Sequence, residues 1–309
     1  MKALVLKSTG SHYHLLLDNG KHAEGRIKGK VRLQGLTTTN PVAVGDKVAV
    51  EETSDGWMAI TGLEPRRNYI VRKSINLSKQ LHVVAANVDQ AFLLITLKNP
   101  YTPPGFIDRF LLTAEAYHIP VTLLFNKTDV YEEKDLKKLN EFIAIYERIG
   151  YRCIRFNSLG GDASEIKKLL KDKTTLISGH SGVGKSTFIN MLQPGLDLKV
   201  AALSDYHEKG QHTTTFAEMF TLDVGGFIID TPGIKGFGIV EVNKNELSHY
   251  FLEMRKLLPQ CKFNNCLHME EPNCAVKKAV EEGIIAPHRY KNYLDIYFDR
   301  ETDEDEKYK

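Results

Sequence analysis

The chain has few cysteines and no long apolar run. It contains four cysteines in 309 residues, and three of them fall together near the C-terminus, which suits a metal site in a reducing compartment better than a disulfide framework. No apolar stretch approaches the roughly 20 residues that a membrane span needs, and the first residues show no signal-peptide pattern. We therefore expect a cytoplasmic protein without membrane contact.

An excess of charge of one sign is also absent. Lysine and arginine number 41 against 39 acidic residues, a net charge of +2, so overall charge neither favours nor excludes a nucleic-acid partner. What the chain does have is enough length for two or three domains. We expect a first domain over residues 1–72, a linker over 73–81, a second domain over 82–240 and a third over 241–309.

The first domain is predicted to consist of short strands separated by turns. The expected strands cover residues 4–7, 12–17, 21–28, 47–51 and 57–61, and Asp18-Asn19-Gly20 is a hairpin signal. Five strands in so short a segment predict a small Greek-key barrel of the OB type.

Basic side chains recur along this segment: Lys21, Arg26, Lys28, Lys30, Arg32, Arg66, Arg67, Arg72 and Lys73. Any one of them is typical of a solvated surface. The whole set on a barrel beside a nucleotide-binding domain instead favours RNA binding.

Apolar strands and amphipathic helices alternate through the second domain. Expected strands cover residues 88–96, 120–125, 151–156, 174–178 and 225–229, and expected helices cover 106–118 and 136–149. This alternation predicts a doubly wound, mostly parallel α/β sheet. The third domain is predicted to be helical over 245–258, 275–282 and 288–298.

A phosphate-binding loop follows the expected strand at 174–178. The pattern GxxxxGK[ST] and the helix start after it are formed by Gly179, His180, Ser181, Gly182, Val183, Gly184, Lys185, Ser186 and Thr187. Lys185 would contact the β- and γ-phosphates of a nucleotide, and the Ser186 hydroxyl would bind Mg²⁺. A chance glycine-rich turn is disfavoured by the strand before the loop and the helix after it.

Two further segments suit the γ-phosphate and its metal. Asp230 ends an apolar strand and starts the turn Asp230-Thr231-Pro232-Gly233, so its carboxylate would face Mg²⁺ and the Gly233 N–H would meet the γ-phosphate. The polar stretch 210–215 carries three consecutive threonines. Of Thr213, Thr214 and Thr215 we choose Thr214 as the Mg²⁺ ligand of a nucleotide switch, although the three also suit the start of a strand at 216–222.

A guanine-binding signature, Asn126-Lys127-Thr128-Asp129, follows the strand at 121–125. The Asp129 carboxylate can accept hydrogen bonds from both N1–H and the 2-amino group of guanine, donors that adenine lacks there. Lys127 would lie along the base, and Asn126 would tie this loop to the phosphate loop. Ser158, in the loop at 157–160, is our candidate for the backbone N–H that meets guanine O6. The signature disfavours a nucleotide kinase or an ATPase.

The order of these signatures is unusual, because the guanine signature normally comes last and here it precedes the phosphate loop. We therefore expect a circularly permuted GTPase. The position after Gly233, where many GTPases place a glutamine that orients water, is Ile234. His212 is the best internal candidate for that role, unless it is only an exposed loop histidine, and we expect slow intrinsic hydrolysis that a partner accelerates.

Cys261, Cys266, His268 and Cys274 lie within one short segment. Three thiols and one imidazole fill a tetrahedral Zn²⁺ site with no open position, which indicates one structural zinc ion. The alternative is a group of free cysteines with a bystander histidine. Cys153 falls in an expected strand and is interpreted as a buried apolar residue.

Taken together, GHSGVGKS, NKTD, GQHTTT, DTPG and the C-x4-C-x-H-x5-C cluster resemble the circularly permuted GTPases, and among them the ribosome small-subunit-dependent GTPase A family. The resemblance covers essentially the whole chain. It implies an α/β fold: a circularly permuted P-loop GTPase domain with an N-terminal OB-type barrel and a C-terminal helical zinc-binding domain. It also implies GTP hydrolysis in late small-subunit assembly, stimulated by that subunit, with binding to the decoding region of its rRNA and catalysis by His212.

Two functional readings remain open. In one, the protein is an enzyme that docks on the maturing small ribosomal subunit with GTP and is released by hydrolysis. In the other, it is an RNA-binding assembly module in which GTP only sets the conformation. On either reading we expect a monomer that uses GTP or GDP with Mg²⁺, and the short connection from Gly233 to the third domain suggests that GTP repositions that domain.

Overall fold

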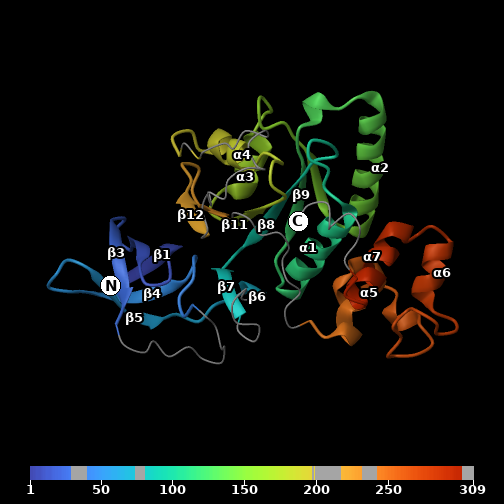
Figure 1. The fold of residues 1–309 in the computed structure, drawn as a ribbon, viewed down its shortest axis with the longest axis horizontal. Helices are drawn as coiled ribbons and strands as arrows, with labels where there is room; N and C mark the ends of the chain where they lie inside the picture. Colours follow the sequence, from blue (N-terminus) through green and yellow to red (C-terminus); the bar gives the residue numbers. More distant parts are fainter. Residues whose placement is uncertain (29–39, 74–80, 197, 199–216, 232–241, 301–309) are drawn as a thin grey trace.

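The computed structural model describes residues 1–28, 40–73, 81–196, 198, 217–231 and 242–300. Three parts follow one another along its long axis (Figure 1). A strand barrel lies at one end, an α/β sheet with its helices in the middle, and a helical part at the other end. No helix in these ranges has the length and apolar character to cross a membrane.

The barrel has the five strands that the sequence predicts. They are β1 (Lys2–Ser8), β2 (Tyr13–Leu17), β3 (His22–Ile27), β4 (Lys47–Glu52) and β5 (Met58–Leu63). The hydrogen-bonded order is β1-β2-β3-β5-β4, and a β1–β4 pairing closes the sheet on itself. Alternate residues point inward, so that Val5, Tyr13, Leu15 and Ile60 form a buried core.

A two-stranded hairpin that the sequence did not predict follows the barrel. Strands β6 (Tyr69–Lys73) and β7 (Leu81–Ala86) pair antiparallel, so both ends of the expected linker are strand residues. Residues 74–80, the rest of that linker, lie outside the described part of the chain.

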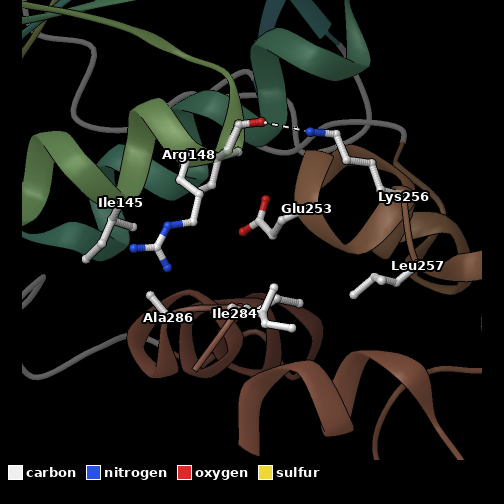
Figure 2. Close-up of a pocket in the computed structure, with 9 residues that line it drawn as sticks. Ile145, Arg148, Glu253, Lys256, Leu257, Ile284 and Ala286 are labelled. Atoms are coloured by element: carbon white, nitrogen blue, oxygen red, sulfur yellow. Dashed lines mark hydrogen bonds between the residues drawn. The ribbon is translucent and has the colours of Figure 1, made fainter. Parts of the chain in front are cut away.

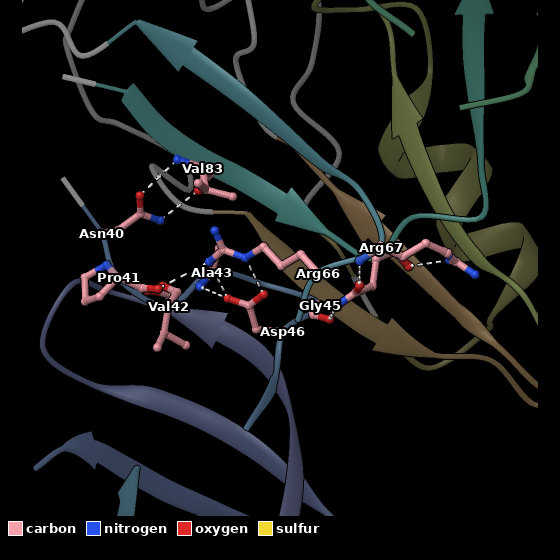
Figure 3. A network of polar contacts seen from close by, with 11 residues as sticks. Asn40, Pro41, Val42, Ala43, Gly45, Asp46, Arg66, Arg67 and Val83 are labelled. Carbon is pink, nitrogen blue, oxygen red and sulfur yellow. Dashed lines mark hydrogen bonds and ion pairs between the residues drawn. The ribbon is translucent and has the colours of Figure 1, made fainter. Parts of the chain in front are cut away.

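Polar contacts join the barrel to this hairpin (Figure 3). Asn40 donates its amide to Val83 O at 2.7 Å and accepts from Val83 N at 2.9 Å. The Arg66 guanidinium binds both oxygens of the fully buried Asp46, at 2.7 and 2.6 Å. Gly45 has a φ of +86°, and a Cβ there would lie 2.1 Å from Ala86 O, so the backbone approach requires glycine.

This arrangement corrects one expectation. Arg66 was counted among the basic residues for RNA, but its side chain is 8% exposed because it is paired with Asp46. It joins the barrel to the rest of the molecule instead of facing solvent. Arg67 remains 61% exposed beside Asp89.

The α/β sheet is mostly parallel, in the order β10-β9-β8-β11-β13-β12. Its strands are β8 (Gln90–Ile95), β9 (Val121–Phe125), β10 (Arg152–Arg155), β11 (Thr174–Ser178), β12 (Glu218–Thr221) and β13 (Phe227–Asp230), with β12 antiparallel to β13. Helices α1 (Pro104–Ala116) and α2 (Glu133–Ile149) pack on the face that carries Leu93 and Ile95. Helices α3 (Ser164–Leu170) and α4 (Lys185–Leu192) cover the face with Phe92 and Leu94.

Barrel and sheet are joined edge to edge. Strand β1 pairs with β12 through Lys7 opposite Glu218, and the two side chains form an ion pair of 2.9 Å. The strand that follows residues 199–216 is therefore hydrogen-bonded to β13 on one side and to the barrel on the other.

The C-terminal part consists of short helices. They are η2 (Lys244–Tyr250), α5 (Leu252–Arg255), η3 (Leu258–Gln260), α6 (Ala275–Glu281) and α7 (Pro287–Tyr297). The single helix expected over 245–258 was wrong. Phe251 has extended backbone angles (φ −98°, ψ 105°) that separate η2 from α5, and its side chain is almost fully buried.

A buried ionic group joins this part to the α/β domain. Arg289 of α7 lies 2.6 Å from Asp108 of α1 and 2.7 Å from Glu253 of α5. A cavity of about 170 Å³ lies beside it, between Ile145 and Ile149 of α2 and the segment around Ile284 (Figure 2).

Candidate functional site

The phosphate loop connects the central strand β11 to helix α4. Its last residue, Gly184, has a φ of +97°, and a Cβ there would lie 2.6 Å from Asn126 Nδ2, so only glycine fits beside the guanine loop. Lys185 donates its Nζ to Gly179 O at 2.6 Å and to His180 O at 2.9 Å. Ser186 and Thr187 occupy the first turn of α4, where backbone N–H groups favour an anion.

Asp230 lies at the end of β13, in register with Ile177 of the adjacent β11. Its Oδ1 atom is buried without a hydrogen-bond partner among the described residues. Burial raises the pKa of Asp230 and lowers that of Lys185, while the attraction between the two charges opposes both shifts. A buried, unpartnered carboxylate oxygen near a phosphate loop fits the oxygen ligands that Mg²⁺ prefers.

The guanine loop follows β9 and is held by buried hydrogen bonds. Asn126 donates to Val183 O at 2.8 Å, which is the expected tie to the phosphate loop. Its Oδ1 atom accepts from both the backbone N–H and the hydroxyl of Ser158, each at 3.0 Å. Tyr131, which the sequence did not single out, donates to Asn126 O at 2.9 Å.

Ser158 has a contact that the sequence did not predict. Its N–H, the proposed donor to guanine O6, donates to Asn126 Oδ1 in this structure and so helps to hold the guanine loop. Lys127 donates to Asn99 O and Gly182 O, at 2.5 and 2.8 Å, which leaves only its alkyl stem to lie along a base. Asp129 is exposed in the turn η1 (Thr128–Val130), as a carboxylate that receives a base must be.

The Asn126 network gives a first prediction. Replacing Asn126 with alanine leaves the Ser158 N–H and Val183 O unpaired in the protein interior, so we expect GTP and GDP affinity to fall together by about 10-fold, which is ~1.4 kcal/mol. Nucleotide titration of the purified variant measures this. Asn140→Ala on the exposed face of α2 is the matched control, and unchanged affinity in Asn126→Ala would contradict the assignment.

Three predicted site residues, His212, Thr214 and Gly233, lie outside the described residues, as do Thr213, Thr215 and Ile234.

Phe106 of α1 adds a contact that no motif indicated. Its ring lies against His180 of the phosphate loop, with centroids 3.8 Å apart.

The four cluster residues come together in the C-terminal part. The ligand atoms of Cys261, Cys266, His268 and Cys274 all lie within 4.8 Å of one another. Burial raises the pKa of the Cys266 thiol to about 12 and lowers that of His268. Thiols in such surroundings stay protonated at neutral pH unless a metal takes the place of the protons, so the donor set fits a four-coordinate Zn²⁺ site.

The loop that carries these ligands is itself fixed by hydrogen bonds. Glu271 accepts from Leu267 N at 2.6 Å and Met269 N at 2.8 Å. Tyr290 of α7 donates to His268 O at 2.6 Å. The cluster is thereby attached to the helix that contacts the α/β domain.

These features define a class: a circularly permuted P-loop GTPase with an OB-type barrel before it and a helical Cys3His module after it. Strand β9, which carries the guanine loop, precedes the phosphate loop in the chain, and in the sheet only β8 separates it from β11, the strand before the phosphate loop. A family profile described as RsgA GTPase matches residues 63–240. The chain belongs to the RsgA GTPase family and is a GTP hydrolase, which confirms the predicted family and fold and excludes the kinase alternative.

Relatives match over nearly the full length. A protein of Bacteroides fragilis strain YCH46, Small ribosomal subunit biogenesis GTPase RsgA, is 52% identical over 97% of each chain. One of the same name from Flavobacterium psychrophilum is 53% identical over 96% of this chain and 92% of its own. Among solved structures, YjeQ from Thermotoga maritima is 33% identical with a TM-score of 0.78, over 97% of this chain and 98% of that one. YloQ, described as a circularly permuted GTPase, is 28% identical with a TM-score of 0.74, over 97% of this chain and 94% of that one.

Proposed function

We propose that this GTPase acts in biogenesis of the small ribosomal subunit and that binding to the subunit stimulates its GTP hydrolysis. The observation that carries the proposal is the match over 97% of the chain to a relative with that named role. The barrel and the metal module flank the GTPase domain at opposite ends (Figure 1), so both can reach RNA while nucleotide is bound between them. We further propose a cytoplasmic monomer with domains at 1–72, 82–240 and 241–309.

Each motif has a proposed role toward the nucleotide, including Thr214 and Gly233, which lie outside the described residues. Asp129 would select guanine, and Lys185 would leave the carbonyls of Gly179 and His180 to contact the β- and γ-phosphates. Mg²⁺, when bound, neutralises charge that develops on the phosphate oxygens, and Ser186, Asp230 and Thr214 would hold it. The Gly233 N–H would meet the γ-phosphate.

His212 is proposed to orient the attacking water. Isoleucine at position 234 has no group that can do so, so the water needs a donor or acceptor from elsewhere. The small subunit would accelerate the reaction by fixing His212 in place.

The test is GTP turnover by the purified protein alone, with isolated small subunits, and with large subunits as the control. We expect strong stimulation by small subunits only. If large subunits stimulate equally, or if small subunits bind without stimulation, the proposed mechanism is wrong.

The same assay with His212→Ala separates the two functional readings. A release cycle driven by hydrolysis predicts that the variant binds small subunits but stays on them in the presence of GTP. An RNA-binding module that uses GTP only for its conformation predicts normal release. Sedimentation of the variant with small subunits in GTP and in GDP measures the difference.

A further inference from the structure

Three side chains, Arg26, His12 and Trp57, pack against one another on the outside of the barrel. The Arg26 guanidinium carbon lies 3.7 Å from the centroid of the Trp57 ring. The His12 ring meets the same tryptophan edge-on, with centroids 5.6 Å apart. Arg26 and His12 are exposed and Trp57 is half-buried. None of the three belongs to the barrel core.

The three side chains come from two connections and one strand of the barrel. His12 comes from the β1–β2 connection, Arg26 from β3, and Trp57 from the β4–β5 connection. In OB-type barrels, the face of strands 2 and 3 and these two connections form the surface that binds oligonucleotides and oligosaccharides. The three side chains thus gather where such a barrel receives a ligand.

Local hydrogen bonds hold the group in position. Thr53 donates its N–H and its hydroxyl to Trp57 O, at 2.9 and 2.8 Å. Asp55 accepts from the same hydroxyl and closes the turn. Ser11 contacts His12 Nδ1 at 2.9 Å. These bonds hold the backbone of the turn at Trp57, and Arg26 and His12 contact its ring, so less order has to be gained on binding, which lowers its entropy cost.

A purely structural role explains the group poorly. An exposed cation–π contact stabilises a protein by only about 0.5–1 kcal/mol, and the barrel is already closed by backbone pairing and a separate apolar core. Two acids lie close to the group: Glu24, whose Oε1 is 3.2 Å from His14 Nδ1, and Asp55, which accepts from Thr53 in the turn before Trp57. Lys21 and Lys28 flank strand β3 on either side and are exposed, so this edge of the barrel favours an anionic ligand.

We propose that Trp57, Arg26 and His12 bind an unpaired nucleotide of single-stranded RNA. The base stacks on the group formed by Trp57 and Arg26, and Arg26 donates to the neighbouring phosphate. Aromatic and guanidinium planes both accept an unstacked base. The inference rests on the proposed function, because the small subunit would be the source of the RNA.

Trp57 is the only tryptophan in the chain, so its fluorescence reports directly on stacking. The full-length protein is titrated with a short single-stranded RNA whose own anisotropy measures binding, and with the same RNA as a duplex. We expect tryptophan quenching that follows the single-strand binding curve, and little effect of the duplex. Binding without quenching, or no binding, overturns the proposal.

Variants test the contribution of each side chain. Trp57→Ala is expected to weaken single-strand binding about 10-fold or more, the range for loss of one base–aromatic stack, whereas Trp57→Phe keeps most of it. Arg26→Ala is expected to make the slope of log affinity against log salt concentration shallower, by the amount that corresponds to roughly one phosphate contact. Lys47→Ala on β4 of the same barrel is the control. If Trp57→Phe loses as much as Trp57→Ala, the ring does not stack and the proposal fails.

Sedimentation with small subunits keeps the two proposals apart. Wild-type protein that quenches with RNA but does not sediment with subunits retains the nucleotide site and loses the proposed function. Wild-type protein that sediments with subunits, but whose tryptophan fluorescence RNA does not quench, supports the proposed function and overturns the nucleotide site.

Discussion

Replacing Arg289 with alanine is expected to lower the free energy of unfolding by about 3–5 kcal/mol, the range for breaking a buried ion pair on one side. The side chain is 1% exposed, and its two partners, Asp108 and Glu253, are 0% and 10% exposed. Alanine would leave two carboxylates in the protein interior without their cation. Guanidinium unfolding of the variant and the wild type measures the difference.

The surroundings of Arg289 explain the size of this effect. Asp108 also accepts from Tyr146 at 2.8 Å and from Asn292 at 2.5 Å. The guanidinium carbon lies 4.7 Å from the centroid of the Phe251 ring. The neighbouring carboxylates hold the pKa of Arg289 well above its usual value despite burial. One substitution therefore disturbs α1, α2, α5 and α7 together.

Arg255→Ala is the matched control. Arg255 lies on the same short helix as Glu253 but is 54% exposed, and its pair with Glu115 is 3.6 Å long, so we expect a change of less than about 1 kcal/mol. Combining Arg289→Met with Asp108→Asn and Glu253→Gln removes all three charges and should recover much of the lost stability. A loss below about 1 kcal/mol for Arg289→Ala would contradict the account.

This ionic group also bears on how GTP acts. The sequence suggested that nucleotide binding repositions the third domain. Movement of α7 relative to α1 would separate Arg289 from Asp108 at the cost of a buried charge. We therefore expect α1 and α7 to stay in contact in both the GTP and GDP forms. A change in distance between spin labels on the two helices would contradict this.

The motifs of the proposed nucleotide site lie on one edge of the sheet because each one is a strand end followed by a turn. The phosphate loop, Asn126–Asp129 and Asp230 all lie at the carboxyl ends of predicted strands, and parallel pairing brings those ends together. Contacts between distant segments could not be predicted in this way. Asp108 and Arg289 meet only through tertiary folding.

Some signals were present in the sequence but ambiguous. Arg289 lies at helical spacing from the buried residues Ile285, Tyr293 and Ile296, and this pattern indicates a buried cation but does not identify its partner. Residues 69–73 and 81–86 have strand composition, yet the polar stretch between them suggested a linker. The break at Phe251 had no local signal, because no proline or glycine stands there.

Loss of the metal site is expected to have the second large effect. Structural Zn²⁺ contributes roughly 10–16 kcal/mol of binding free energy to small zinc domains, and here Cys266 and Cys274 belong to the same core as Phe251 and Tyr293. Chelation, or Cys274→Ser, should therefore abolish hydrogen-exchange protection in α6 and α7. Protection in β11 and α4 should persist, because those elements have their own core. Zinc content, measured by mass spectrometry, should fall from one per chain.

The fourth cysteine supplies the control for this experiment. Cys153 lies in β10, where burial raises the pKa of its thiol to about 12, and it has no part in the cluster. Cys153→Ser should keep one zinc per chain and full protection in α7. If α7 instead stays protected after complete removal of zinc, the contacts of Arg289 with α1 and α5 are sufficient to fold the module, and the metal has another purpose. Leu112 of α1 also lies in the module's core. Within the GTPase domain, loss of zinc should therefore lower hydrogen-exchange protection first in α1. This helix contacts the phosphate loop through Phe106 and His180.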